Sequence, residues 1–85
     1  MKRIDVTETD GRLHLLSSDS DEDARHEVVL CSAEDVTFPA VWLDDERVYD
    51  VEVWQDNALV AAVPPRSDEV DASFAEHERR RSIRG

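Results

Sequence analysis

The sequence has 85 residues, of which 40% are hydrophobic, and it carries 21 acidic against 10 basic residues, a net charge of −11. This length supports one domain with a modest core and excludes two. Because non-specific affinity for nucleic acid comes from Lys and Arg, such a charge opposes binding to phosphate backbones everywhere except at a local basic patch.

Cysteine content and hydropathy bear on where the protein resides. Cys31 is the only cysteine, so neither an internal disulfide nor a multi-cysteine zinc site can form. The sequence has no run of about 18 apolar residues and no basic-then-apolar leader. We therefore expect a cytoplasmic protein without membrane spans.

The composition also suggests adaptation to salt. Twelve of the acids are Asp, Lys2 stands alone among nine arginines, and Ile4 and Ile83 are the only isoleucines. This pattern resembles that of cytosolic proteins of extreme halophiles, although the resemblance is one of composition and identifies no family. An acidic protein adapted to ordinary salt is the alternative.

The first half of the chain predicts strands. Residues 3–17 alternate as a hairpin around Asp10-Gly11, a strong turn signal. The acidic stretch Ser17 to Arg25 predicts a surface loop, in which Asp19 to Asp23 superficially resembles a calcium loop but lacks its glycine and its final glutamate. The apolar run within residues 26–32 predicts a strand covered on both faces.

The next segments predict short strands and one central hairpin. Residues 36–38 end at Pro39 and predict a short or edge strand, and residues 40–43 predict another that a three-residue loop would join to residues 47–63. In the central hairpin, Asp56-Asn57 favours a type I′ turn. That turn would pair Val53 with Val60 and Val51 with Ala62 on an apolar face.

The last segment predicts a helix from Ser67 to about Arg81. Pro64-Pro65 ends the preceding strand, Ser67 or Asp68 serves as N-cap, acids occupy the first turn and arginines the far end. The fold we expect is therefore mainly β within the α+β class: a small antiparallel sheet or incomplete barrel of five to six short strands, with one C-terminal helix. Residues 1–66 form the β part, and residues 67–85 add the helix and a basic tail to the same domain.

The second face of the central hairpin is the first candidate interaction surface. In the predicted register both tryptophans share a mixed face with apolar and acidic neighbours: Trp42, Val48, Asp50, Glu52, Trp54 and Leu59. Tryptophan is enriched among interface anchors, so this face predicts contact with a protein partner or a second copy of the chain. If the C-terminal helix buried both indoles, this face of the hairpin would instead be a second side of the core. The substitution Asp50→Val should be tolerated on such a face.

The basic tail is the second candidate. Its arginines are Arg79, Arg80, Arg81 and Arg84, and residues 79–85 contain no acid. Helix-spaced pairs of Glu76 with Arg80 and Glu78 with Arg81 would also explain these charges. We expect a contact element separable from the fold, whose removal costs no more than about 1 kcal/mol.

Catalytic chemistry finds little support in the sequence. Asp50 and Glu52 could cooperate as two acids near tryptophans, but solvated positions on the outside of a sheet are the simpler interpretation. No close pair of histidines or cysteines and no glycine-rich loop is present, so we expect no metal and no cofactor. The sequence thus predicts a non-enzymatic interaction or accessory module. The alternative is a small regulator that contacts nucleic acid through the arginine tail, which the charge disfavours.

Overall fold

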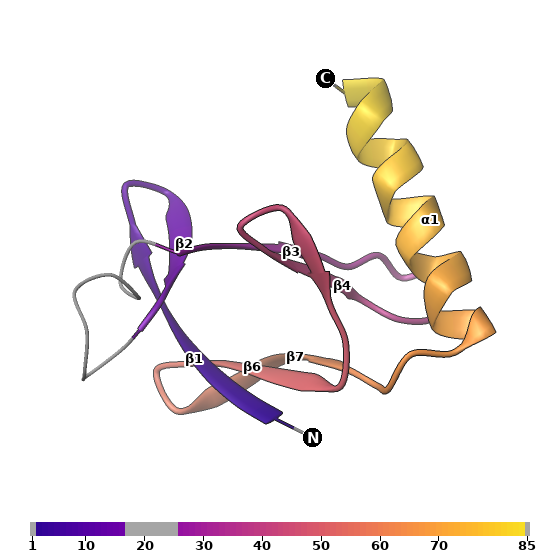
Figure 1. Cartoon of the computed structure of the whole chain (residues 1–85). Helices are drawn as coiled ribbons and strands as arrows, with labels where there is room; N and C mark the ends of the chain where they lie inside the picture. The colour runs from indigo at the N-terminus through magenta and orange to yellow at the C-terminus, as the bar shows by residue number, and fades with distance from the viewer. Residues whose placement is uncertain (1, 17–25, 85) are drawn as a thin grey trace.

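The computed structural model describes residues 2–16 and 26–84, with side chains through Arg81. Within those residues it contains seven strands and one helix: β1 (Lys2–Thr9), β2 (Arg12–Leu15), β3 (Glu27–Cys31), β4 (Ala40–Leu43), β5 (Glu46–Val48), β6 (Val51–Gln55), β7 (Ala58–Val63) and α1 (Asp68–Arg84). The strands form one sheet in the order β5-β4-β3-β2-β1-β6-β7, with α1 to one side (Figure 1). The predicted class is confirmed, with one strand more than expected. The predicted acidic loop from Ser17 to Arg25 lies outside the described residues.

The sheet is mixed rather than purely antiparallel. The predicted strand at residues 47–55 is interrupted at Tyr49 and Asp50, where Asp50 takes a φ of 56° that regular strands do not allow. The first piece, β5, pairs with β4, whereas the second, β6, pairs with β7 on one side and runs parallel to β1 on the other. The interruption therefore redirects the chain from one edge of the sheet to the far side.

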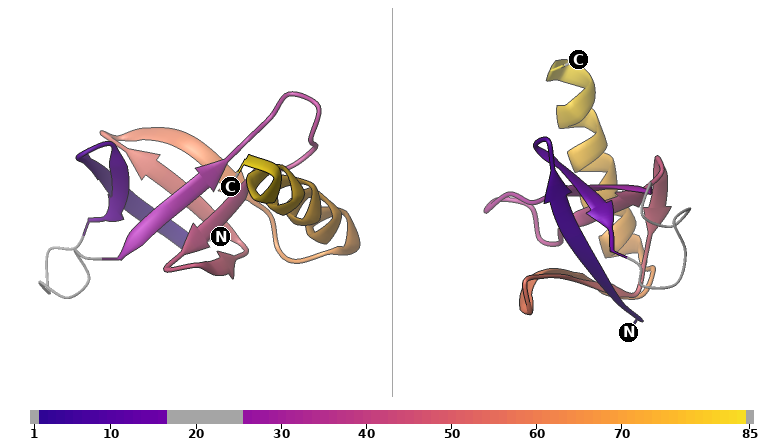
Figure 2. Two further views of the ribbon diagram at one scale, coloured as in Figure 1. Left: turned by 90° about the horizontal axis from the view of Figure 1, so that it is seen from above. Right: turned by 90° about the vertical axis from the view of Figure 1, so that its left-hand side faces the viewer.

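The connection between β5 and β6 requires the sheet to curl. These strands are five positions apart in the sheet, about 24 Å if the sheet were flat. Only two residues join them, and three Cα steps span at most about 11 Å. Figure 1 shows the result, with β3 and β4 lying above β6 and β7 and β1 crossing between the two layers, and Figure 2 shows the curl from two further sides. The sheet approaches a barrel, but in the pairings described β5 and β7 remain as edges.

Three hairpins turn through two-residue loops with positive φ at both positions. These loops are Asp10-Gly11, Asp44-Asp45 and Asp56-Asn57. Asp and Asn tolerate the left-handed region because their short polar side chains hydrogen-bond locally, which explains how a chain with two glycines builds three such turns. The first and third loops were predicted. The second is one residue shorter than expected and places Val41 opposite Val48.

The core fills the concave face of the curled sheet. Side chains alternate along each strand, and the cross-strand registers place one residue set on the inside of all seven strands. Its most buried members are Val6, Val28, Val41, Val51, Val53, Ala61 and Val63. Partly buried residues such as Ile4, Leu13 and Leu15 complete this layer. The inner face therefore contains mainly β-branched side chains, as a pleated surface favours.

A β-bulge corrects the predicted register of the last hairpin. Trp54 pairs with Leu59, but Val53 pairs with Ala61 instead of Val60, and the pairing shifts between these two positions. Val60 is the extra residue on β7. It was predicted to be buried opposite Val53, yet 43% of it is exposed, because a bulge leaves one residue without a cross-strand partner.

Helix α1 covers the outer face of β4 and β5. Ser67 is its N-cap, with its Oγ accepting a hydrogen bond from the Val70 amide at 3.2 Å. Phe74 is fully buried and packs edge to face on Trp42, with ring centroids 5.4 Å apart.

Among the described residues, no helix has the length and apolar character that a membrane crossing requires.

The segment before β4 is held by the helix instead of by the sheet. Residues 36–38, predicted as a short strand, form bends. The amide of Phe38 donates to Ser73 Oγ at 3.3 Å, and its carbonyl accepts a hydrogen bond from His77 Nε2 at 2.9 Å. The helix therefore satisfies both backbone groups of Phe38, so this segment does not need a neighbouring strand.

Candidate interaction surface

Trp54 lies on the outer face of β6 within a small polar network. The Arg3 guanidinium stacks on the indole at 4.3 Å from its centroid and hydrogen-bonds Asp5 at 3.0 Å. The indole Nε1 donates to Glu52 at 3.3 Å. This network orients the indole, which remains partly exposed because α1 lies over β4 and β5, on another part of the sheet.

The exposed large apolar side chains gather around Trp54. Among the described residues these are Leu16, Leu59 and Val60, which are 58%, 49% and 43% exposed. Trp54 pairs with Leu59 on the neighbouring strand β7 and with Asp5 on the other neighbouring strand, β1. Leu16 donates its amide to the Asp5 carbonyl at 2.8 Å, which continues the β1–β2 register by one residue and places Leu16 next in the row. We call Leu16, Trp54, Leu59 and Val60 the outer-face patch.

The edge strand of this patch carries a bulge but no charge that would oppose association. Strand β7 reads Ala-Leu-Val-Ala-Ala-Val and contains no charged residue, in a protein with a net charge of −11. Exposed edges are normally protected by charges, proline or bulges. Here the bulge at Val60 interrupts the regular ladder, so contact through side chains is favoured over simple strand addition.

Trp42 does not share this surface. It is 3% exposed, Phe74 covers one side of its indole, and the Arg81 guanidinium lies 4.4 Å from its centroid. Both tryptophans do face outward from the sheet, but β3, β2 and β1 separate their strands. The predicted common tryptophan face is therefore wrong: Trp42 belongs to the second side of the core, under the helix, and Trp54 belongs to the outer-face patch.

The remaining residues of the predicted mixed face are also dispersed. Val48 points inward opposite Val41, and Asp50 forms the exposed corner between β5 and β6. The backbone of Asp50 joins three segments, donating to the Pro64 carbonyl at 3.1 Å and accepting from the Lys2 amide at 3.0 Å. Asp50 therefore lies outside strand β6, whereas Glu52 lies within it and accepts the hydrogen bond from Trp54.

The arginines at the helix end bind the protein's own surface. Arg80 binds Asp35 through two hydrogen bonds, at 3.1 and 2.6 Å, and Glu76 through a third at 3.2 Å. Arg79 also binds Glu76. Glu78, predicted to pair with Arg81, instead reaches Arg47 on β5. The side chain of Arg84 lies outside the described residues. Arg80 and Arg81 are therefore integrated with the fold, contrary to the expectation of a separable tail.

Two carboxylates near the helix have shifted pKa values. The hydrogen bond from Arg80 lowers the pKa of Asp35 below its usual value of 3.8. The hydrogen bond from the Tyr49 hydroxyl, at 3.0 Å, lowers the pKa of Asp71, with a further contribution from Arg66. In return, the Asp35 carboxylate raises the pKa of the Arg80 guanidinium. Both acids are therefore held ionised in contacts that join α1 to the rest of the fold.

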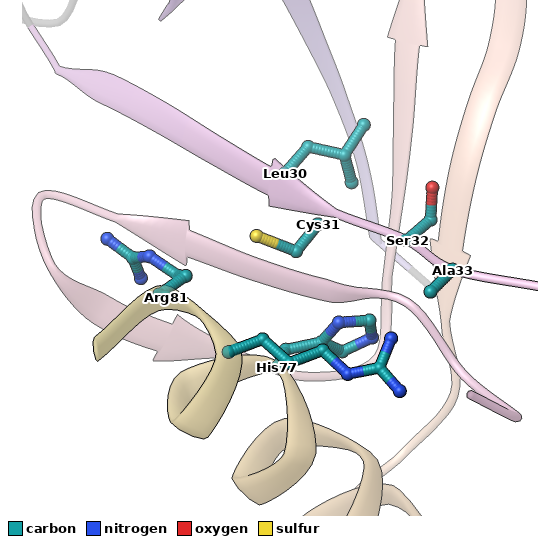
Figure 3. Close-up of a pocket in the computed structure, with 7 residues that line it drawn as sticks. Leu30, Cys31, Ser32, Ala33, His77 and Arg81 are labelled. Atoms are coloured by element: carbon teal, nitrogen blue, oxygen red, sulfur yellow. The ribbon is translucent and has the colours of Figure 1, made fainter. Parts of the chain in front are cut away.

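A cavity of about 650 Å³ opens between the end of β3 and the C-terminal half of α1 (Figure 3). Its lining consists of Leu30, Cys31, Ser32, Ala33, His77, Arg80 and Arg81. In Figure 3 the Cys31 side chain extends toward Arg81, whereas Leu30 and Ser32 extend away from the helix, as strand alternation requires. The cavity therefore combines a thiol and two guanidinium groups.

The described residues offer no assembled metal site. No group of three or more His, Cys, Asp or Glu side chains among them is arranged to hold an ion. The three histidines are dispersed: His14 on β2, His26 beside Asp44, and His77 against the Phe38 carbonyl.

Comparisons with known proteins add no family. A scan against models of protein families and searches of curated proteins and of solved structures found no match. The function therefore has to be argued from the residues themselves.

Sequence reasoning missed two features of these surfaces. Nothing in the sequence signals the bulge at Val60, because the apolar run on β7 fits either register. Arg81, in contrast, was detectable: Val70, Phe74, His77 and Arg81 recur at the spacing of one helix face, and the first three are buried. That spacing places Arg81 on the packed side of α1.

Proposed function

We propose that the chain is a non-enzymatic interaction module that associates with a second copy of itself through the outer-face patch. The observation that supports this is the gathering of the exposed large apolar side chains of the described residues, Leu16, Leu59 and Val60, around one partly exposed tryptophan. Isolated exposed apolar residues need no explanation, whereas several of them around one tryptophan, beside an uncharged edge strand, indicate a contact surface.

Self-association is favoured over a charged partner by the composition of the patch. Strand β7 contributes only apolar side chains, and Arg3 near Trp54 is already bound to Asp5. A two-fold contact would place Leu59 and Val60 against their own counterparts without burying a charge from β7. Four side chains are few compared with the roughly 20–30 per partner of a standard interface, so the association should be weak.

Net charge makes this association dependent on salt. Two copies at −11 each repel one another at low ionic strength, where the Debye length is about 30 Å at 0.01 M. At 1 M the length falls to about 3 Å, and contact between apolar patches can dominate. The module would therefore assemble in concentrated salt and dissociate on dilution.

The nucleic-acid alternative has less support from the contacts. Arg79 and Arg80 are bound to acidic side chains, and Arg81 stacks on Trp42. Phosphate contacts would have to replace these interactions, in a protein whose overall charge repels the ligand.

The test is the mass in solution at increasing protein concentration in 2 M potassium chloride. We expect the intact chain to approach the mass of a dimer, and Leu16→Ser with Leu59→Ser to remain a monomer with an unchanged fold. Val36→Ser, which removes a valine from the loop before β4, is the control and should dimerise normally. A monomer at every concentration and salt, or a dimer that the double variant does not weaken, would exclude the proposal.

A further inference from the structure

The cavity beside α1 contains a positive charge that no acid among the described residues neutralises. Among the described residues Arg80 is matched by Asp35 and Glu76, and Arg79 by Glu76, whereas Arg81 has no carboxylate partner. The guanidinium of Arg81 instead lies on the Trp42 indole at 4.4 Å. Arg81 thus lines the cavity without an acid partner among residues 2–16 and 26–81, although the protein has more than twice as many acids as bases.

Arg81 is exposed, but its guanidinium lies against a surface that is itself fixed. Trp42 is 3% exposed and is itself fixed by Phe74, so the surface on which Arg81 stacks is rigid. His77, one turn earlier on the same helix face, is buried and bound to the Phe38 carbonyl at 2.9 Å. A guanidinium held against an aromatic ring loses less further freedom when it binds a planar anion than a fully solvated one does.

The volume of the cavity indicates how large a ligand it can hold. Its volume of about 650 Å³ falls within the range of small-molecule sites, about 300–1,000 Å³. The lining opposite Arg81 is largely uncharged, formed by Cys31, Ala33 and the chain around Leu30 and Ser32. A carboxylate could thus meet the guanidinium in two parallel hydrogen bonds while a small ring occupies the uncharged side.

We propose that this cavity binds small organic carboxylates, with Arg81 as the residue that recognises the anion. Arg80 shapes the wall but does not recognise the ligand, because its Nε, Nη1 and Nη2 all donate to Asp35 or Glu76. Cys31, the only cysteine, lies inside the cavity and reports whether it is occupied. This site is separate from the outer-face patch.

The test measures how fast the uncharged reagent 4,4′-dithiodipyridine modifies Cys31 in the folded, full-length chain. Sodium benzoate is the probe anion, uncharged benzamide is its matched control, and ionic strength is held constant. We expect benzoate to slow modification saturably, with half-maximal protection at about 1–10 mM, the affinity of a small ligand held by one charged contact. Benzamide should protect at least tenfold less well at the same concentration.

Variants assign the effect to Arg81. Arg81→Gln should raise the half-protecting benzoate concentration at least tenfold, and Arg81→Lys, which keeps the charge, should raise it less. Arg79→Gln is the matched control, since it removes one charge from the same helix turn without touching the cavity lining, and it should change protection less than twofold. Circular dichroism verifies that each variant is folded.

Every other result would overturn the proposal. Equal protection by benzoate and benzamide would show that charge is not recognised. Equal effects of Arg81→Gln and Arg79→Gln would show that a general electrostatic field, and not a binding site, causes the protection. A Cys31 that the uncharged reagent cannot modify in the folded protein would show that the cavity does not admit a ring.

Discussion

Arg80 and Asp35 join the C-terminal half of helix α1 to the segment that follows β3. The guanidinium donates through Nη1 at 3.1 Å and through Nη2 at 2.6 Å to the two carboxylate oxygens, while its Nε donates to Glu76 at 3.2 Å. Such two-point contacts fix orientation as well as distance. Together with the two backbone hydrogen bonds of Phe38, they anchor the helix to the segment between β3 and β4.

The first prediction concerns acid. Because Arg80 lowers the pKa of Asp35, the folded state binds that proton more weakly than the unfolded state does. The stability from this pair is complete above the ordinary pKa of 3.8 and is lost as the pH falls through the lower value of the folded protein. Asp35→Asn should therefore lower the Tm at pH 6 and flatten its decline below about pH 4.

Glu34→Gln is the control for this pH profile. Glu34 is exposed beside Asp35, and the substitution also removes one negative charge. Thermal melts from pH 2 to 6 should show the intact chain and Glu34→Gln declining in parallel in acid. Parallel decline of Asp35→Asn as well would mean that Asp35 contributes nothing to the pH dependence.

A second prediction concerns the end of the helix. A chain that stops after Glu78 loses the contacts of Arg80 with Asp35 and of Arg81 with Trp42, whereas one that stops after Arg81 retains both. The cation–π contact alone is worth about 0.5–1 kcal/mol, or about 2–8 °C in Tm for a domain of this size. The shorter chain should therefore melt several degrees below the longer one. Identical melting temperatures would restore the idea of a separable tail.

Local signals in the sequence predicted most of the secondary structure. Turn residues such as Asp10-Gly11 and Asp56-Asn57, the N-cap Ser67 and the alternation on β1 and β6 all act over a few residues, so they can be detected without knowledge of the fold. The α+β class followed from these elements.

The candidate surface was harder to predict because it depends on which strands become neighbours. Continuous β character from Arg47 to Gln55 conceals the corner at Asp50, and that corner moves β6 next to β1. As a result Trp42 and Trp54 are separated, and Leu16 joins Trp54 from a distant part of the sequence. The long-range parallel pairing has no local signature in the sequence.

A third prediction follows from the corner itself. At a φ of 56°, Asp50 occupies the left-handed region, where a β-branched side chain is strongly disfavoured. The sequence suggested that Asp50→Val would be tolerated. The structure instead predicts that the free energy of unfolding of the Asp50→Val variant is about 1–2 kcal/mol lower than that of the Asp50→Gly variant. Both variants remove the same carboxylate, so the difference in urea unfolding isolates the backbone effect. Equal stabilities would show that the corner relaxes without cost.

The last prediction tests the salt adaptation that the composition suggests. Contacts such as Arg3 with Asp5 and Arg80 with Asp35 neutralise some of the acids, but the chain of 85 residues retains an excess of 11 negative charges that repel one another. Their repulsion destabilises the folded state most when screening is weak, and ion pairs on the surface lose less from added salt than the acids gain. We expect the Tm measured by circular dichroism to be higher in 2 M than in 10 mM potassium chloride.

Replacement of the exposed acids Glu34, Asp45 and Asp68 by their amides should reduce that difference in Tm, because it removes repulsion that the salt otherwise screens. A Tm in 10 mM salt equal to or above that in 2 M salt would favour an acidic protein adapted to ordinary salt.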